Sequence, residues 1–210
     1  KDGYLNTYFT VKDTEKRWTN LLEGHELYCS GHLIEAACTY YEATGKRKLL
    51  DIAVKNAECI YDRFVMQNTE GIPGHPEIEL ALLRLYRLTE NKHFLELAKK
   101  FIDERGKAPD FWAREAKKRS WSVWNSDPWD NDYRQSAKPV REQTEAVGHA
   151  VRAVYLYTGM ADLAAETEDK ELFAACRRLW ENIVHRKMYI TGGIGSTVQG
   201  EAFTVDYDLP

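Results

Sequence analysis

A helix-and-turn pattern recurs along this chain at a spacing close to 45 residues. Residues 44–53, TGKRKLLDIA, align with residues 89–98, TENKHFLELA, and residues 167–176, TEDKELFAAC, repeat the pattern a third time. A repeat of this length, with apolar residues at intervals of three and four, is typical of stacked helical hairpins. Such hairpins either close into an α/α barrel or remain an open solenoid. The predicted fold class is therefore all-α.

Short turns that contain Gly, Asn or Pro divide the chain into six expected helices. These helices cover residues 21–42, 48–64, 77–88, 92–104, 142–157 and 170–185. Two strand-like pieces, residues 4–11 and 202–207, predict short extended segments at both ends of the chain. The Thr158-Gly159 pair is interpreted as the turn that follows the fifth helix.

An insertion at residues 107–140 interrupts the repeat and is rich in Trp, Asp, Asn and Pro. Long loops inside compact domains are usually functional or disordered, and the aromatic content of this one argues against disorder. We expect a lid or rim over a binding site. Its tryptophans are Trp112, Trp121, Trp124 and Trp129.

Composition excludes several classes of function. The 210 residues carry a net charge of −4 with no basic stripe, so a nucleic-acid partner is not expected. No apolar run is long enough to cross a bilayer. The four cysteines lack CxxC spacing and are expected to be buried, reduced thiols, which favours a cytoplasmic location. The chain starts at Lys1 rather than Met and stops inside the tract that ends at Pro210, so we expect a piece of a longer protein.

Three Gly-His pairs stand where first helices of hairpins are expected to begin. Their histidines are His25, His75 and His149. If the hairpins close into a barrel, the first helices line its inside and these positions converge at one mouth. Histidines at helix N-termini can form hydrogen bonds with ligand hydroxyl groups. By contrast, His32 is expected to lie in the core, and His93 and His185 to be structural.

Glu201 is the carboxylate whose setting differs from the others. It follows the glycine-rich tract 191–200, and glycines allow close backbone approach to a ligand. A carboxyl group partly desolvated there could hold a proton near neutral pH and serve as a general acid. Glu142 is expected only to cap its helix. Because retaining glycoside hydrolysis also needs a nucleophile, the residues alone give half of such a site.

Several motifs, in order along the chain, resemble glycoside hydrolase family 127, the family of β-L-arabinofuranosidases. The motifs are Asp2–Phe9, Glu23–Cys29, Gly31–Ala36, Gly74–Glu79, Pro139–His149 and Thr191–Ser196. The resemblance implies a catalytic (α/α)6 barrel followed by β-sandwich domains, so residues 1–210 would be part of the barrel.

The resemblance also implies an activity and roles for residues. The family retains anomeric configuration and releases L-arabinose from β-L-arabinofuranosides, with a zinc-bound cysteine thiolate as nucleophile and a glutamate as general acid/base. Glu201 matches that glutamate, and His25, His75 and His149 match histidines that contact the substrate. The implied partner is an arabinose-containing oligosaccharide or glycoconjugate, and a second copy of the chain in a homodimer is a further expectation.

The chain departs from the family pattern in two places. The zinc ligands and the nucleophile belong to motifs expected beyond Pro210, and none of the four cysteines matches them. No metal ligand is therefore assigned within this chain, and the 210 residues alone are expected to be inactive and to bind no stoichiometric zinc. Relatives also often carry a histidine where this chain has Ala137, which bears on substrate specificity.

Two other functions stay open. An α/α-barrel sugar 2-epimerase would use His75 and His149 as acid and base, and would tolerate Glu201→Gln. A non-catalytic carbohydrate-binding helical repeat would bind arabinosides whether or not Glu201 is present.

Overall fold

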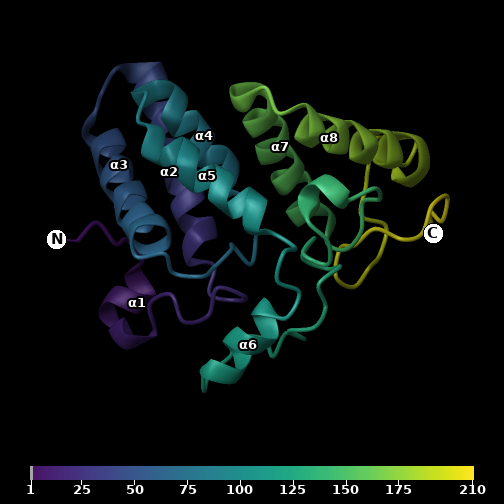
Figure 1. The fold of residues 1–210 in the computed structure, drawn as a ribbon, viewed down its shortest axis with the longest axis horizontal. Helices are drawn as coiled ribbons and strands as arrows, with labels where there is room; N and C mark the ends of the chain where they lie inside the picture. The colour runs from purple at the N-terminus through teal and green to yellow at the C-terminus, as the bar shows by residue number, and fades with distance from the viewer. Residues whose placement is uncertain (1) are drawn as a thin grey trace.

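The computed structural model describes residues 2–210 and contains eight α-helices in that range (Figure 1). The helices are α1 Thr7–Val11, α2 Glu26–Thr44, α3 Lys48–Tyr61, α4 Ile78–Thr89, α5 Lys92–Glu104, α6 Phe111–Lys118, α7 Ala150–Thr167 and α8 Lys170–Asn182. Short 3-10 helices lie at Thr14–Lys16 and Val140–Glu142, and π-helical turns at Asp62–Met66 and Ile183–Lys187 extend α3 and α8.

The predicted all-α class is confirmed, and the helices form three hairpins. The pairs α2 with α3, α4 with α5 and α7 with α8 pack together, and α4 also contacts both α2 and α7. The first helices of the hairpins therefore form one layer, as they do on the inside of a helical barrel. Figure 1 shows α2 to α5 grouped together, with α7 and α8 beside them.

Amphipathic helices and well-placed caps explain this arrangement. In α3 the buried positions include Leu50, Ala53, Ala57 and Ile60, which recur at intervals of three and four and pack into the main core. Helix α2 ends at Thr44 and is capped by Gly45, whose φ of 69° is left-handed and whose N–H donates to Tyr41 O. Glycine adopts this conformation without a Cβ penalty, so the chain turns sharply into α3.

The two extended end segments predicted from the sequence are wrong. Residues 7–11 form α1 because the Asn6 side chain caps the helix, its oxygen accepting the Phe9 N–H at 3.2 Å. Residues 202–207 form no strand. Within residues 2–210 the sole β-pairing is an isolated bridge between His149 and Ala202.

The predicted bounds of the fifth helix are also wrong. Helix α7 begins at Ala150 and continues through Thr158 and Gly159 to Thr167. Gly159 lies against α4, where an added Cβ would be 3.1 Å from Glu79 Cβ. This glycine therefore permits close helix packing and does not mark a turn.

Three smaller expectations also need correction. The insertion is not a simple loop: it contains α6, and Trp112 is fully buried in the core. Glu142 belongs to a 3-10 turn and caps no α-helix. Among the cysteines Cys38 is buried, but Cys29 is exposed.

No helix in the described part of the chain is long and apolar enough to cross a membrane.

Candidate active site

The three histidines of the Gly-His pairs lie close together at the starts of α2, α4 and α7. His25 and His149 are the N-cap residues of α2 and α7, and His75 precedes α4 by three positions. The ring centroids of His25 and His75 are 5.7 Å apart, and those of His75 and His149 are also 5.7 Å apart. The layer formed by the first helices thus brings one histidine from each hairpin to the same place.

Backbone carbonyls assign the tautomers of His25 and His75. His25 Nδ1 lies 2.7 Å from Glu23 O, and His75 Nδ1 lies 2.7 Å from Pro76 O. A carbonyl only accepts, so each Nδ1 carries the hydrogen and each Nε2 is an acceptor. Burial lowers the pKa of both rings, that of His75 to about 3, so both are neutral near pH 7. Each can accept a hydrogen bond from a ligand hydroxyl.

His149 has the opposite tautomer and is paired with Glu201. Its Nδ1 accepts the N–H of Arg152 at 3.1 Å, so its Nε2 carries the hydrogen and donates to Glu201 Oε2 at 3.0 Å. Burial, assisted by the positive charge of Arg152, lowers the pKa of His149. Both ring nitrogens are therefore occupied within the protein, and Oε1 of Glu201 has no partner among residues 2–210.

The glycine-rich tract is attached to the start of α7, which places Glu201. The Glu201 carbonyl accepts the Ala150 N–H at 2.9 Å, and the Phe203 N–H donates to Gly148 O at 2.9 Å. Gly195, with a φ of 76°, lies so near α7 that an added Cβ would be 2.8 Å from Ala150 Cβ. The tract therefore needs glycine there for close approach.

The expected desolvation of Glu201 is wrong for this structure. Its side chain is 73% exposed, because the tract packs through its backbone and leaves the carboxylate pointing outward. The histidine that bonds to it is far less exposed, at 10%. The site is thus open on the Glu201 side.

Two tyrosines and His32 complete the ring cluster and were not singled out from the sequence for this role. Tyr28 lies 4.5 Å from His75 and 4.4 Å from His32 between ring centroids, and Tyr155 contacts all three. His25, Tyr28 and His32 are spaced by three and four, which places them on one face of α2 and could have revealed the group. His32 has a side chain 44% exposed, so its expected core position is wrong.

A buried carboxyl group lies beneath this cluster. Glu77 is 1% exposed, its Oε1 is 3.6 Å from His32 Nδ1, and its Oε2 has no hydrogen-bond partner among residues 2–210. Burial, with the nearby charges of Glu35 and Glu79, raises the pKa of Glu77 to about 9. The carboxyl group lies tightly against α2, because an added Cβ on Gly31 would be 1.5 Å from Glu77 Oε2.

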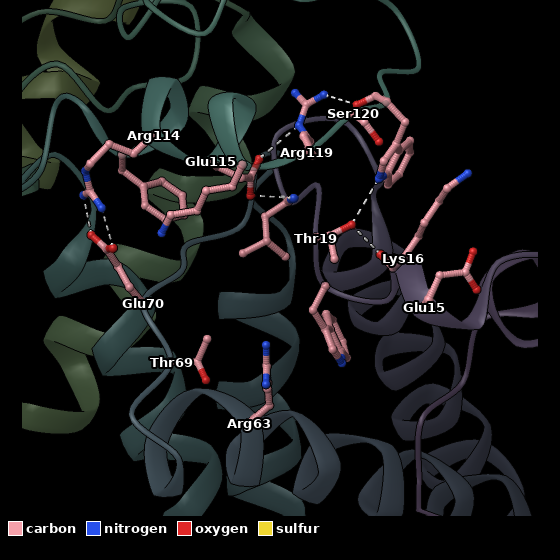
Figure 2. A pocket seen from close by; sticks show the side chains of 15 residues that line it. Glu15, Lys16, Thr19, Arg63, Thr69, Glu70, Arg114, Glu115, Arg119 and Ser120 are labelled. Atoms are coloured by element: carbon pink, nitrogen blue, oxygen red, sulfur yellow. Dashed lines mark hydrogen bonds and ion pairs between the residues drawn. The ribbon is translucent and has the colours of Figure 1, made fainter.

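The insertion separates the cluster from a cavity of about 620 Å³ whose walls are shown in Figure 2. Arg63 and Thr69 lie on one side of the cavity, and Lys16 and Thr19 lie on another. Trp121 lines the cavity, whereas Trp124, three residues later, contacts His25. None of the three histidines and no part of Glu201 lines this space.

The described residues do not fit a zinc site. No group of three His, Cys, Asp or Glu side chains within residues 2–210 is arranged to hold a metal ion. The four cysteines are free thiols on α2, α3 and α8. No metal ligand or thiolate nucleophile is therefore assigned to this stretch.

Comparisons with known proteins agree with the motifs of the sequence. The family model of the β-L-arabinofuranosidase GH127 catalytic domain matches residues 1–210. A non-reducing end β-L-arabinofuranosidase from Bifidobacterium longum subsp. longum is 43% identical over 222 residues, which cover 100% of this chain and 33% of that protein.

Solved structures show the same relationship. A GH127 β-L-arabinofuranosidase from Geobacillus stearothermophilus T6 superposes with a TM-score of 0.92 at 52% identity, and a GH127 β-arabinofuranosidase with 0.84 at 44%. Both matches cover 100% of this chain, and 33% and 32% of the respective structures. This chain thus spans about a third of the length of these relatives. With a family model that matches every residue, the chain belongs to the glycoside hydrolase family 127 catalytic domains.

Proposed function

We propose that this chain supplies the general acid/base and the sugar-binding histidines of a retaining exo-glycosidase that releases L-arabinose from β-L-arabinofuranosides. The observation that carries the proposal is the hydrogen bond from His149 Nε2 to Glu201 Oε2, next to two neutral histidines with free acceptor nitrogens. The names of the relatives support the sugar: each is a β-arabinofuranosidase.

Glu201 transfers the proton in the proposed mechanism. In the first step Oε1 of the protonated carboxyl group donates its proton to the glycosidic oxygen, the bond between this oxygen and the anomeric carbon breaks, and the nucleophile bonds to that carbon. The carboxylate left behind keeps the hydrogen bond from His149 Nε2, which favours its negative charge. In the second step the same carboxylate takes a proton from the water that attacks the anomeric carbon, and the bond between that carbon and the nucleophile breaks.

His25 and His75 bind the sugar in this mechanism. Each neutral ring keeps its Nδ1 hydrogen on a backbone carbonyl and offers Nε2 to a hydroxyl of the arabinose. Because both rings stay uncharged near pH 7, they accept hydroxyl hydrogens without competing for the proton on Glu201. Both ring nitrogens of His149 form hydrogen bonds within the protein. We therefore propose that His149 affects the substrate indirectly, by holding Glu201, and not by the direct contact that the sequence predicted.

The nucleophile is proposed to lie outside these 210 residues. Residues 2–210 contain no metal-binding group, and this chain spans about a third of its relatives. We propose a zinc-bound cysteine beyond residue 210, with the rest of the barrel and the β-sandwich domains. The 210 residues alone are then expected to be inactive and to bind no stoichiometric zinc, which activity assays and metal analysis of that piece would check.

The cellular setting and partners are part of the same proposal. The four free thiols support a reducing, cytoplasmic environment. The proposed partner is an arabinose-containing oligosaccharide or glycoconjugate, and a homodimer is proposed for the assembly.

The proposal is tested by measuring the release of L-arabinose from a β-L-arabinofuranoside. The full gene product and its Glu201→Gln variant are compared in the same assay. Loss of an acid/base group should lower kcat/KM by roughly 10²- to 10⁴-fold. Glu168→Gln is a matched control, because Glu168 is also exposed and also has a positive φ, 54° against 47° for Glu201, but lies at the far end of α7. Full activity in Glu201→Gln would reject the proposed role.

A further inference from the structure

The carboxylate of Glu23 is buried and holds a segment about one hundred residues away. Its side chain is 0% exposed. The Ser122 hydroxyl lies 2.8 and 2.7 Å from its two oxygens, and the backbone N–H groups of Val123 and Ser126 donate to it at 2.7 and 2.8 Å. Burial opposes ionisation, but these hydrogen bonds and one from Asn20 outweigh it and lower the pKa of Glu23 to about 2. Glu23 is therefore a fixed negative charge that orders the turn at residues 122–126.

This turn presents Trp124 to the histidines. The Trp124 ring meets His25 edge-on, with centroids 5.2 Å apart and planes at 90°. Within the turn, Asn125 adopts a φ of 53° and its N–H bonds to Ser122 Oγ at 2.8 Å. The carbonyl of Glu23 also accepts the Nδ1 hydrogen of His25. One residue thus fixes both the tautomer of His25 and the ring that packs against it.

Trp124 does not contribute to the core. The residue is 60% exposed, and its Nε1 forms no hydrogen bond within residues 2–210. Trp121 in the same segment differs, because its Nε1 donates to Thr19 Oγ1 at 3.2 Å. A fully buried charge that orders a turn carrying a largely exposed indole is an arrangement that suits ligand binding, since aromatic faces pack well against apolar C–H surfaces.

The order of contacts shows where along the site this ring lies. Glu201 bonds to His149, His149 contacts His75, and His75 contacts His25. Trp124 contacts His25 and thus stands at the other end of this series from Glu201. Glu201 marks the glycosidic oxygen, so an arabinose bound along the histidines would meet Trp124 at its far edge.

We propose that Trp124 forms an end wall that packs against the terminal arabinose on the side away from the scissile bond, and that Glu23 is the positioning residue that holds this wall. The inference rests on the proposed function, because Glu201 defines which end carries the glycosidic oxygen. A wall at that end explains how the site would accept a single terminal sugar.

Binding in the full gene product tests the end wall without turnover. Two ligands, methyl β-L-arabinofuranoside and a β-L-arabinofuranosyl disaccharide, are titrated by calorimetry into two proteins. One protein carries Glu201→Gln alone, and the other carries Glu201→Gln together with Trp124→Ala. We expect both ligands to bind about three- to ten-fold more weakly, and by a similar factor, because both share the terminal arabinose. Trp129→Ala is the matched control, since Trp129 is 64% exposed in the same insertion and has no ring contact with the histidines.

Glu23→Gln tests the positioning role. An amide leaves fewer acceptors for the hydrogen-bond donors of the turn, so KM should rise by a similar factor while kcat changes little. Any sugar-dependent fluorescence change that Trp124→Ala removes should also shrink in Glu23→Gln. Glu115→Gln is the control: Glu115 is another little-exposed carboxylate that accepts backbone N–H groups, from Leu21 and Leu22, and it lies outside the turn.

The outcomes distinguish failure of the end wall, failure of the positioning role of Glu23 and failure of the proposed function. Weaker binding of the disaccharide alone would place Trp124 on the leaving-group side and overturn the end wall, as would unchanged binding of both ligands. A fall in kcat with KM unchanged in Glu23→Gln would overturn the positioning role. If the Glu201→Gln protein shows Trp124-dependent binding of both ligands but the protein with Glu201 intact shows no turnover, the proposed function fails and the end wall stands as a sugar contact. If the Glu201→Gln protein binds neither ligand and the protein with Glu201 intact shows no turnover, both proposals fail.

Discussion

His149 donates its Nε2 hydrogen to Oε2 of Glu201 at 3.0 Å, while its Nδ1 accepts the N–H of Arg152. The Arg152 N–H of α7 thus sets the tautomer of His149. In that tautomer Nε2 carries the hydrogen, so Nε2 is the atom that can donate to the carboxylate. This hydrogen bond connects the glycine-rich tract, through Glu201, to the start of α7, although the carboxylate itself is exposed.

Replacing His149 tests whether that hydrogen bond contributes to catalysis. In the full gene product, His149→Ala removes a donor to the carboxylate and should lower kcat/KM for a β-L-arabinofuranoside about ten- to hundred-fold. His149→Gln, which keeps an N–H donor, should recover part of the loss. Profiles of kcat/KM against pH for both variants give the measurement. Equal activity in the parent and His149→Ala would contradict the inferred role.

Glu77 should make the protein less stable as pH rises. Its pKa of about 9 in the folded state lies above the ordinary 4.5, so the folded state holds a proton that the unfolded state releases between these values. Unfolding free energy then falls with pH across that window, by up to about 1.4 kcal/mol per unit. Glu77→Gln should melt at least about 3 °C higher than the parent at pH 8, with little difference at pH 4.5. Thermal melts at both pH values decide this, and parallel shifts at both would refute it.

His75 should act in the opposite direction at acid pH. Its folded-state pKa of about 3 lies below the ordinary 6.5, so the unfolded state takes up a proton first as pH falls. The stability that the neutral ring contributes is present above pH 6.5 and is lost as pH falls toward 3. In His75→Gln the unfolding midpoint should depend less on pH between 4 and 6.5. An unchanged slope would show that His75 is protonated in the folded protein.

The contact of Gly31 with Glu77 predicts a strong packing effect. An added Cβ at Gly31 would be 1.5 Å from Glu77 Oε2 and 2.8 Å from Ile78 Cα, so Gly31→Ala should push α2 away from α4. A cost of about 1–3 kcal/mol is expected, measured as a lower unfolding midpoint. Gly193→Ala is the control, because its nearest atoms are 3.9 Å away. Equal midpoints for the two variants would contradict so close an approach of α2 to Glu77.

The helical periodicity predicted most of the fold because each hairpin buries its own apolar stripe. Helix α5 begins and ends where the pattern predicted, at Lys92 and Glu104. The pattern failed at residues 142–149, whose backbone is held by tertiary partners: the Ala146 N–H donates to Asn182 Oδ1 at 2.9 Å. A local pattern cannot show a hydrogen bond to a side chain on another helix.

The sequence by itself determined the helical class, the family and the residue types at the site, since these follow from periodicity and from local motifs. The tertiary structure decided which residues meet. His149 and Glu201 are 52 positions apart, and Ser126 binds Glu23 across 103 positions. Such pairs depend on how hairpins and the insertion pack, so the pairing, the tautomers and the burial of Glu77 and Glu23 became visible only in three dimensions.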